Sequence, residues 1–232
     1  MKKALVVFSG GLDSTTVLAK CCKEYGTNYV YTLSFYYAQR HLKELHAVAA
    51  IEEHYDIPEA NRLQYDVANL FAHAKSNPLL SETKEMPVGS YESQGDAPAT
   101  EVPFRNGIFL SIASSIAMEK GIDFVYCGIH QDDDRSAYAD TSPAFFDGLR
   151  LAVAAGTHNK VTLRAPFINS SKGDIVTEGL ELKAPFGLTW SCYEGGEKPC
   201  GKCGTCIQRA EAFKAAEAID PLAESIIPPE EE

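Results

Sequence analysis

The chain has 232 residues, of which 45% are hydrophobic and 23% are charged, and its formal net charge is −11. This length and apolar content suit one medium-sized domain with a buried core and exclude a disordered chain. Because nucleic acid is held by clustered Lys and Arg, so acidic a chain is not expected to bind it, whereas small anionic ligands remain compatible with it.

The N-terminus and the cysteine content bear on location. Two lysines precede an apolar run at residues 4–8, which is too short for a signal peptide or a membrane span. The seven cysteines are interpreted as thiols or metal ligands before disulfides. We therefore expect a cytoplasmic protein with no membrane partner.

The first third of the chain alternates between strand and helix patterns. Residues 4–9 form a continuous apolar run of the kind found in a strand buried on both faces. Residues 14–25 have helical spacing, and residues 29–35 are rich in β-forming side chains. A second helix is expected at residues 41–55 and a third, short strand at residues 61–65.

The segment 76–103 is rich in Pro, Gly, Ser and Glu, and we expect a long functional loop there. Beyond it the alternation resumes, interrupted by a polar loop at residues 131–142. The expected elements are a helix at 108–120, a strand at 124–127, a helix at 143–155, a strand at 161–164 and a helix that opens with capping-box spacing at 171–174 and ends near 182. Such alternation implies right-handed βαβ crossovers, so the expected fold class is α/β with a doubly wound parallel sheet.

A glycine-containing string separates the first strand from the first helix: Ser9-Gly10-Gly11-Leu12-Asp13-Ser14. Its glycines allow a sharp turn that brings backbone N–H groups close to a ligand. Ser14 is expected to cap the helix, whose N-terminus favours an anion. An ordinary βα turn also uses Gly and Ser, but the full string at this position is more specific than that. It matches neither the Walker loop nor the dinucleotide fingerprint.

The string resembles the loop of the ATP pyrophosphatases (PP-loop enzymes), which split ATP between its α and β phosphates. GMP synthetase, NAD synthetase, asparagine synthetase and several tRNA-thiolating enzymes share it. The resemblance implies that ATP is bound by Phe8, Ser9, Gly10, Gly11, Leu12, Asp13, Ser14, Thr15, Thr16, Val17 and Leu18. It also implies that Asp13 holds Mg²⁺ or orients pyrophosphate, and that Ser9, Asp13 and Ser14 serve catalysis.

Four cysteines near the C-terminus follow the pattern Cys-x7-Cys-x2-Cys-x2-Cys: Cys192, Cys200, Cys203 and Cys206. Four thiolates match a closed tetrahedral Zn²⁺ site with a structural role. A helix at residues 206–218 is expected to carry the last ligand at its N-terminus, where the helix dipole favours a thiolate. An iron–sulfur cluster or a redox dithiol is compatible with the same spacing. We divide the chain into an ATP-binding α/β domain, residues 1–185, and a zinc-binding segment, residues 186–232.

The order of the motifs along nearly the whole chain resembles the 7-cyano-7-deazaguanine synthases of queuosine biosynthesis. These motifs are the phosphate loop, Val102-Pro103-Phe104-Arg105-Asn106, Gly128-Ile129-His130 and the four cysteines. The resemblance implies a carbon–nitrogen ligase in which ATP adenylates the carboxylate of 7-carboxy-7-deazaguanine and ammonia displaces AMP. A second ATP would convert the resulting amide to a nitrile. The resemblance also implies a homodimer.

Further site residues are expected from these motifs. Arg105 and Lys172 are expected to stabilise charge on the transferred phosphorus and on pyrophosphate. Arg105 and Asn106 are expected to contact the substrate, and Asn106 also to cap a helix that begins at residue 107. Tyr138 and Asp140 suit a guanine-like ring, because a tyrosine stacks on it and a carboxylate accepts two N–H bonds from its edge. The family commonly has Tyr-Pro-Asp-Cys where this chain has Tyr138-Ala139-Asp140-Thr141.

Two other functions are compatible with these patterns. One is a related PP-loop adenylase that acts on another carboxylate or on tRNA; the acidic balance argues against the tRNA substrate. The other is a zinc-knuckle module that binds RNA through aromatic and basic residues. Trp190 and Tyr193 supply aromatic rings beside the cysteines, but Glu194, Glu197 and Glu211 dilute the positive charge that such a module needs.

Overall fold

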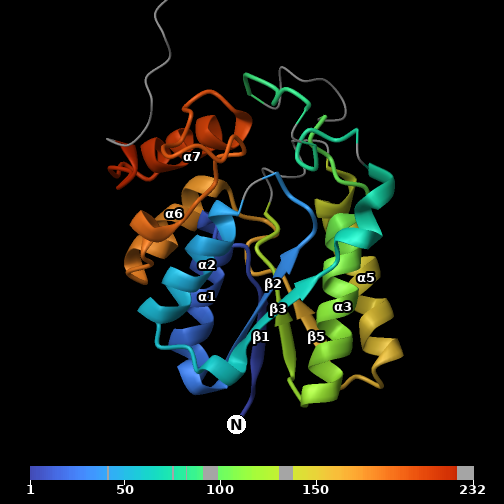
Figure 1. Ribbon diagram of the computed structural model, residues 1–232. Coiled ribbons are helices and arrows are strands. Elements are labelled where there is room, and N and C mark those ends of the chain that lie inside the picture. Colours follow the sequence, from blue (N-terminus) through green and yellow to red (C-terminus); the bar gives the residue numbers. More distant parts are fainter. Residues whose placement is uncertain (41, 75, 82, 91–98, 131–137, 224–232) are drawn as a thin grey trace, which may run out of the picture.

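The computed structural model describes residues 1–40, 42–74, 76–81, 83–90, 99–130 and 138–223. Its centre is a five-stranded parallel sheet with the order β3-β2-β1-β4-β5 (Figure 1). The strands are β1 (Ala4–Val7), β2 (Val30–Tyr36), β3 (Arg62–Asp66), β4 (Phe124–Tyr126) and β5 (Thr162–Arg164). The chain first adds strands on one side of β1 and then on the other, so a switch point lies between β1 and β4.

Helices cover both faces of the sheet, which confirms the doubly wound α/β class (Figure 1). One face carries α1 (Leu12–Tyr25), α2 (Lys43–His54) and α6 (Lys172–Glu181), and the opposite face carries α3 (Arg105–Lys120) and α5 (Pro143–Gly156). The last helix, α7 (Gly204–Ala215), packs on α6. Short 3₁₀ turns complete the fold at Thr27–Tyr29, Glu59–Asn61, Ala68–Ala74, Ala139–Thr141 and Phe186–Leu188.

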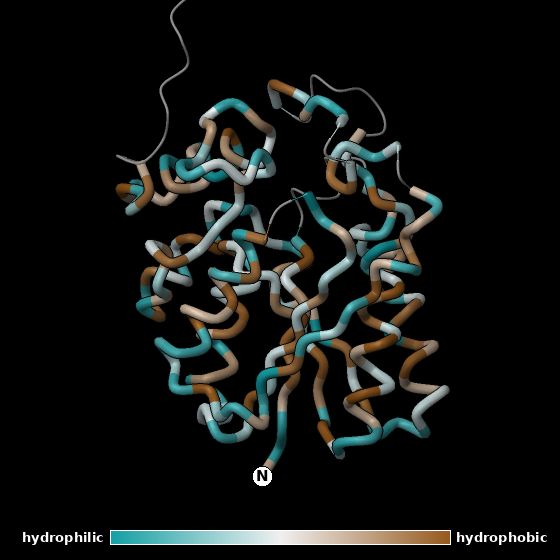
Figure 2. Tube along the Cα trace, in the orientation of Figure 1, coloured by the Kyte–Doolittle hydropathy of each residue, from teal (hydrophilic) through white to brown (hydrophobic). Residues whose placement is uncertain are grey.

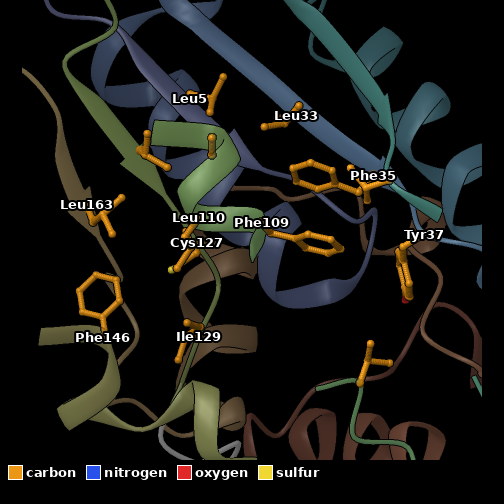
Figure 3. Close-up of a cluster of buried hydrophobic side chains, with 14 of the residues drawn as sticks. Leu5, Leu33, Phe35, Tyr37, Phe109, Leu110, Cys127, Ile129, Phe146 and Leu163 are labelled. Carbon is orange, nitrogen blue, oxygen red and sulfur yellow. The ribbon is translucent and has the colours of Figure 1, made fainter. Parts of the chain in front are cut away.

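The alternating side chains of β1 feed two separate cores. Leu5 packs with the side chains of α3 and α5, whereas Ala4 and Val6 pack with those of α1, α2 and α6. This explains the continuous apolar run, because a central strand covered on both faces has no solvent side. Figure 2 shows hydrophobic segments along the central strands and on the helices beside them, and Figure 3 shows part of the first core, where Phe35 stacks on Phe109 at 4.1 Å between ring centroids.

Two predictions about helix starts were wrong. The first helix begins at Leu12 with Gly11 at its N-cap, and Ser14 does not cap it; the Ser14 hydroxyl donates back to the Gly11 carbonyl at 3.2 Å. Asn106 does not cap α3 either. That helix begins at Arg105 after Phe104, whose backbone is left-handed with φ 54°.

The capping box that opens α6 is confirmed. The Ser171 side chain accepts from the backbone N–H of Asp174, and the Asp174 carboxylate accepts from the backbone N–H of Ser171. This reciprocal pair satisfies two of the N–H groups that a helix start leaves unpaired. It fixes the position of Lys172, the first residue of α6.

A buried ion pair and the hydrogen bonds beside it join three parts of the C-terminal segment to one another. Arg209 on α7 makes a bidentate pair with Asp220 at 2.7 and 2.8 Å, and it also donates to the Thr189 hydroxyl and to the Phe186 carbonyl. Because each guanidinium nitrogen has an acceptor, this arrangement fixes the path of the chain around the cysteines.

The described part of the expected loop 76–103 reaches the C-terminal segment. Val88 forms an antiparallel bridge with Cys203, and the N–H of Gly89 donates to the carbonyl of Lys202 at 3.0 Å. Residues 91–98 of that loop, the acidic residues 132–134 and the tail 224–232 lie outside the described residues. Within the described chain, no helix has the length and apolar character needed to span a membrane.

Candidate active site

A cavity of about 260 Å³ opens where β1, β2 and β4 end. It lies at the switch point, the position at which open parallel sheets bind ligands. Its walls come from the loop after β1, the start of α2, the start of α3 and the residues that follow β4. The start of α6 and the segment 190–193 close the cavity on the remaining side.

The loop after β1 presents backbone donors to this cavity. The N-cap Gly11 offers no side chain to the first turn of α1, and Gly11, Leu12, Asp13 and Ser14 all line the cavity. Hydroxyl groups brace the loop from within, with Ser9 Oγ 3.2 Å from Ser14 Oγ and Thr15 donating to the Gly11 carbonyl at 2.8 Å. Since the first-turn N–H groups of a helix lack intrahelical acceptors, this arrangement suits an anion such as a phosphate.

Gly10 is required by the packing of this loop on α2. Its φ is +77°, and a Cβ there would lie 2.8 Å from the carbonyl oxygen of Glu44 and 2.9 Å from the backbone nitrogen of Val48. The loop therefore touches the backbone of the first turns of α2 directly. Gly128, after β4, is similarly close, because its Cβ would lie 3.2 Å from the backbone nitrogen of Ser14.

A lysine and a histidine converge on Asp13 in the first turn of α1. Lys172 Nζ lies 3.3 Å from Asp13 Oδ2, and Nε2 of the buried His130 lies 3.7 Å from the same oxygen. The other oxygen, Asp13 Oδ1, is buried and accepts no hydrogen bond from any residue that the structure describes. A buried carboxylate oxygen that still has its lone pairs suits a Mg²⁺ ligand, because Mg²⁺ prefers oxygen donors.

The other end of the cavity combines aromatic rings with a cation. The Arg105 guanidinium lies 5.6 Å from the ring centroid of Tyr37 and donates to its hydroxyl at 3.3 Å. Burial raises the pKa of Tyr37 to about 12, so its hydroxyl stays protonated. Phe35 and Phe109 complete an apolar wall against which a flat ring can pack (Figure 3).

Asp140 lines the same end of the cavity and is held there by the first turn of α3. Its carboxylate accepts from the backbone N–H of Asn106 at 2.7 Å and from the Asn106 side chain at 3.1 Å. Tyr138 forms a hydrogen bond with the hydroxyl of Thr100 at 2.7 Å. Asn106, Tyr138, Asp140 and Thr141 all line the cavity.

The four C-terminal cysteines form a compact group whose sulfur atoms all lie within 4.8 Å of one another. Four thiolates around a tetrahedral Zn²⁺ with Zn–S bonds near 2.3 Å would lie about 3.8 Å apart, so the group can hold such an ion with small adjustments. The N–H of Cys200 donates to the sulfur of Cys192, and the N–H of Cys203 donates to the sulfur of Cys200. These N–H groups are typical partners of metal-bound thiolates.

Trp190 connects the cysteine group to the phosphate loop. Its backbone N–H donates to the Gly10 carbonyl at 3.0 Å, and its indole N–H donates to the Cys192 carbonyl at 2.9 Å. Lys43 lies over the Trp190 ring at 4.8 Å. Hydrogen bonds of Trp190 therefore join the cysteine group to the loop that faces the cavity.

The structure brings most of the expected site residues together and leaves some out. Lining the cavity are Phe8, Ser9, Gly11, Leu12, Asp13, Ser14, Arg105, Asn106, Tyr138, Asp140 and Lys172. Gly10 lies in the same turn but packs against α2. Thr15, Thr16, Val17 and Leu18 are buried inside the molecule and do not line the cavity.

Several residues of this site were not assigned a role from the sequence, and three of them lie beside the phosphate loop. Glu44 lines the cavity, His130 contacts Asp13, and Trp190 holds the loop. The position of His130 just after β4 is a usable signal, because side chains beyond the ends of parallel strands face the ligand. Glu44 and Trp190 give no such signal, since an acidic residue in a first helical turn and a tryptophan near cysteines are common without a site.

Fold and site together define a doubly wound α/β protein with a ligand cavity at the switch point of its sheet. The family model described as Queuosine biosynthesis protein QueC matches residues 3–217, and the chain belongs to this family. Curated relatives named 7-cyano-7-deazaguanine synthase, which is a ligase, extend over nearly the whole chain. The relative from Rhizobium rhizogenes is 39% identical over 94% of this chain and 90% of its own length.

Further relatives with the same name come from distant organisms. The protein of Oceanobacillus iheyensis is 37% identical over 95% of this chain and 97% of its own length. That of Thermoplasma volcanium is 38% identical over 98% of this chain and 92% of its own length. Among solved structures, the U34-tRNA thiolase NcsA of Methanococcus maripaludis, with its 4Fe-4S cluster, aligns with a TM-score of 0.47 and 15% identity, over 93% of this chain and 65% of that one.

Proposed function

We propose that this protein converts 7-carboxy-7-deazaguanine, ammonia and ATP to 7-cyano-7-deazaguanine, as a step in queuosine biosynthesis. The observation that carries the proposal is the family match over residues 3–217, which contains the whole phosphate loop and the cysteine group. A cavity with phosphate donors at one end and a flat aromatic wall at the other supports the same reaction.

The chemistry needs two activations of one carbon. A carboxylate oxygen is a poor leaving group. The substrate carboxylate therefore attacks the α-phosphorus of ATP and releases pyrophosphate, and its oxygen becomes part of an AMP group, which leaves readily. Ammonia then forms the C–N bond as the C–O bond to AMP breaks. The amide oxygen repeats the attack on a second ATP, and its departure with AMP leaves the nitrile.

The phosphate end of the cavity supports this role through placed donors. Negative charge develops on the phosphates as pyrophosphate leaves, and the first-turn N–H groups of α1 together with Lys172 meet it. Ser9 and Ser14 keep the loop in shape through their hydroxyl contact. Asp13 supplies the carboxylate that would hold Mg²⁺ beside the phosphates, where the ion neutralises charge.

The aromatic end supports binding of the deazaguanine ring. Arg105 faces the cavity with its charge and suits the carboxylate of the acid substrate. Asp140 keeps its carboxylate toward the cavity and suits the donor edge of a guanine-like ring. Asn106 holds Asp140 in place.

The cysteine group is proposed to hold Zn²⁺ as a structural ion. Its donor set of four sulfurs leaves no coordination position for a substrate. We also propose that residues 186–232 form one zinc-binding segment. The protein is further proposed to act as a homodimer and to be located in the cytoplasm. Sedimentation equilibrium of the purified protein tests the homodimer.

The direct experiment is to incubate the protein with ATP, Mg²⁺, ammonium and 7-carboxy-7-deazaguanine and to follow the substrate by mass spectrometry. Appearance of the amide and then the nitrile supports the proposal. If 7-carboxy-7-deazaguanine stays unchanged although the protein is folded and holds its metal, the proposed function is refuted. An analogue of 7-carboxy-7-deazaguanine that lacks the exocyclic amine serves as the matched control for the ring contact.

A further inference from the structure

Three carboxylates line the cavity, and one of them differs from the others in its contacts. Asp13 is paired with Lys172, and Asp140 accepts two hydrogen bonds from Asn106. Glu44 also lines the cavity but makes neither a hydrogen bond nor an ion pair with any residue in the described part of the chain. A carboxylate in a ligand cavity without a structural partner is available to the ligand.

Glu44 is placed beside the phosphate loop by backbone packing. It lies in the first turn of α2, and its own carbonyl is the group that excludes a side chain at Gly10. Its position relative to the loop is therefore fixed by main-chain contact, which side-chain motion does not alter. The residue as a whole is half-buried, and it borders the cavity.

The reaction proposed above requires a proton acceptor in this cavity. Ammonia carries three hydrogens and the nitrile nitrogen carries none. One proton leaves the nitrogen when the C–N bond forms and AMP departs to give the amide. The other two leave after the amide oxygen has been adenylated, as the C–O bond breaks and AMP carries the oxygen away. No oxidant or reductant is involved.

The other groups that face this space are poor acceptors. Arg105 and Lys172 are cations, Asp13 is paired, and Asp140 is engaged by α3. The high pKa of Tyr37 keeps it protonated. Arg105 acts on the charge of Glu44, and Glu44 acts on the titration of Tyr37. The other titratable groups that line the same cavity are Tyr193, Asp13, Lys172 and Asp140.

We propose that Glu44 is the general base of the reaction, accepting a proton from the nitrogen when ammonia attacks the acyl adenylate and again when the adenylated amide becomes the nitrile. This role rests on the proposed function. The titration of Glu44 agrees with this role. Burial raises its pKa from 4.5 to about 7, and the charge of Arg105 acts in the opposite direction. An acceptor is most effective when its pKa lies near the working pH.

The test measures adenylation of the substrate separately from the two steps in which the nitrogen loses protons. Glu44→Gln keeps the shape of the side chain but cannot accept a proton, Glu44→Asp keeps the carboxylate, and Glu53→Gln changes an exposed glutamate on the same helix as the control. For each protein we would measure acid-dependent ATP–pyrophosphate exchange without ammonium. We would also measure amide formation, and nitrile formation from the isolated amide, from about pH 6 to 9 at constant free ammonia.

The expected result is selective. Glu44→Gln should keep exchange within about threefold of the wild type and lose about 100-fold in both nitrogen steps, the usual contribution of a general base. The wild-type and Glu53→Gln rates should fall as the pH drops below about 7, because the carboxylate becomes protonated there. Glu44→Gln should lack this acidic limb, and Glu44→Asp should restore part of the rate together with the limb.

Three results would overturn the role of Glu44. The first is a Glu44→Gln protein that forms amide within about threefold of the wild-type rate. The second is an acidic limb that persists in Glu44→Gln. The third is a parallel loss of exchange and amide formation, because that pattern marks a residue that only builds the ATP site. Absence of exchange in the wild-type protein would instead refute the proposed function, and the role of Glu44 with it.

Discussion

Lys172 Nζ lies 3.3 Å from Asp13 Oδ2, so the first turns of α6 and α1 meet through one ion pair at the edge of the cavity. Both side chains are partly accessible, with 13% and 24% of their surface exposed. A cation, a carboxylate and a helix N-terminus are thus brought to the same place by segments far apart in the sequence.

Asp13→Asn is expected to abolish turnover with little effect on folding. The substitution removes the charge that pairs with Lys172 and that would hold Mg²⁺, while keeping the size of the side chain. Acid-dependent ATP–pyrophosphate exchange should fall by about 100-fold or more, since phosphoryl transfer depends on placed charges. Asp147→Asn on the exposed face of α5 is the control. Full exchange activity in Asp13→Asn would remove this carboxylate from the mechanism.

Gly10→Ala is expected to destabilise the protein by about 2–5 kcal/mol. The left-handed backbone costs a non-glycine residue about 1–2 kcal/mol, and contact with the α2 backbone adds an overpacking cost of about 1–3 kcal/mol. Gly26→Ala is a control for the positive φ, because its φ is +82° and its Cβ would meet no atom within 4 Å. Urea denaturation of both proteins measures the difference. Equal losses in the two variants would show that the contact with α2 carries no cost.

Cys203→Ser is expected to lose the metal, to lower the melting temperature and to weaken the binding of ATP. The last effect follows because Trp190 joins the Cys192 carbonyl to the Gly10 carbonyl. Metal analysis should give about one Zn²⁺ per chain in the wild type, the stoichiometry of a four-cysteine site. Cys22→Ser on α1 is the control and should keep its metal. A metal-free Cys203→Ser protein with unchanged melting would contradict the structural role.

Glu44→Gln is expected to stabilise the folded protein at about pH 8 and to do so less at about pH 5. Burial raises the pKa of Glu44 to about 7, above its value of 4.5 in the unfolded chain. The folded state therefore binds more protons between these two values, and stability falls as the pH rises through this window. The gain at pH 8 should be about 1–2 kcal/mol, allowing for solvent screening at a half-buried site. Denaturation curves at the two pH values measure it, and an equal effect at both would contradict the titration.

The elements that the sequence predicted well are those whose signal is local. The apolar run of β1, the phosphate string and the Ser171–Asp174 capping box each specify their structure over a few residues. The four cysteines were predicted as one site from spacing alone, and their sulfur atoms are grouped in the structure.

The predictions that failed depend on tertiary contacts. Asn106 has the composition of a helix cap, but it is engaged by Asp140, 34 positions later in the chain. Ser14 likewise looks like a cap, but its hydroxyl braces the loop between Ser9 and Gly11. The role of Glu44 was not visible either, because only the sheet topology brings the start of α2 against the loop after β1.

The most direct test of the account follows the phosphorus of ATP during turnover by ³¹P NMR, with 7-carboxy-7-deazaguanine and ammonium present. Two AMP and two pyrophosphate are expected for each nitrile formed, one pair for each activation of the carbon. Release of ADP and inorganic phosphate in place of these products would contradict cleavage of ATP between its α and β phosphates at the loop after β1.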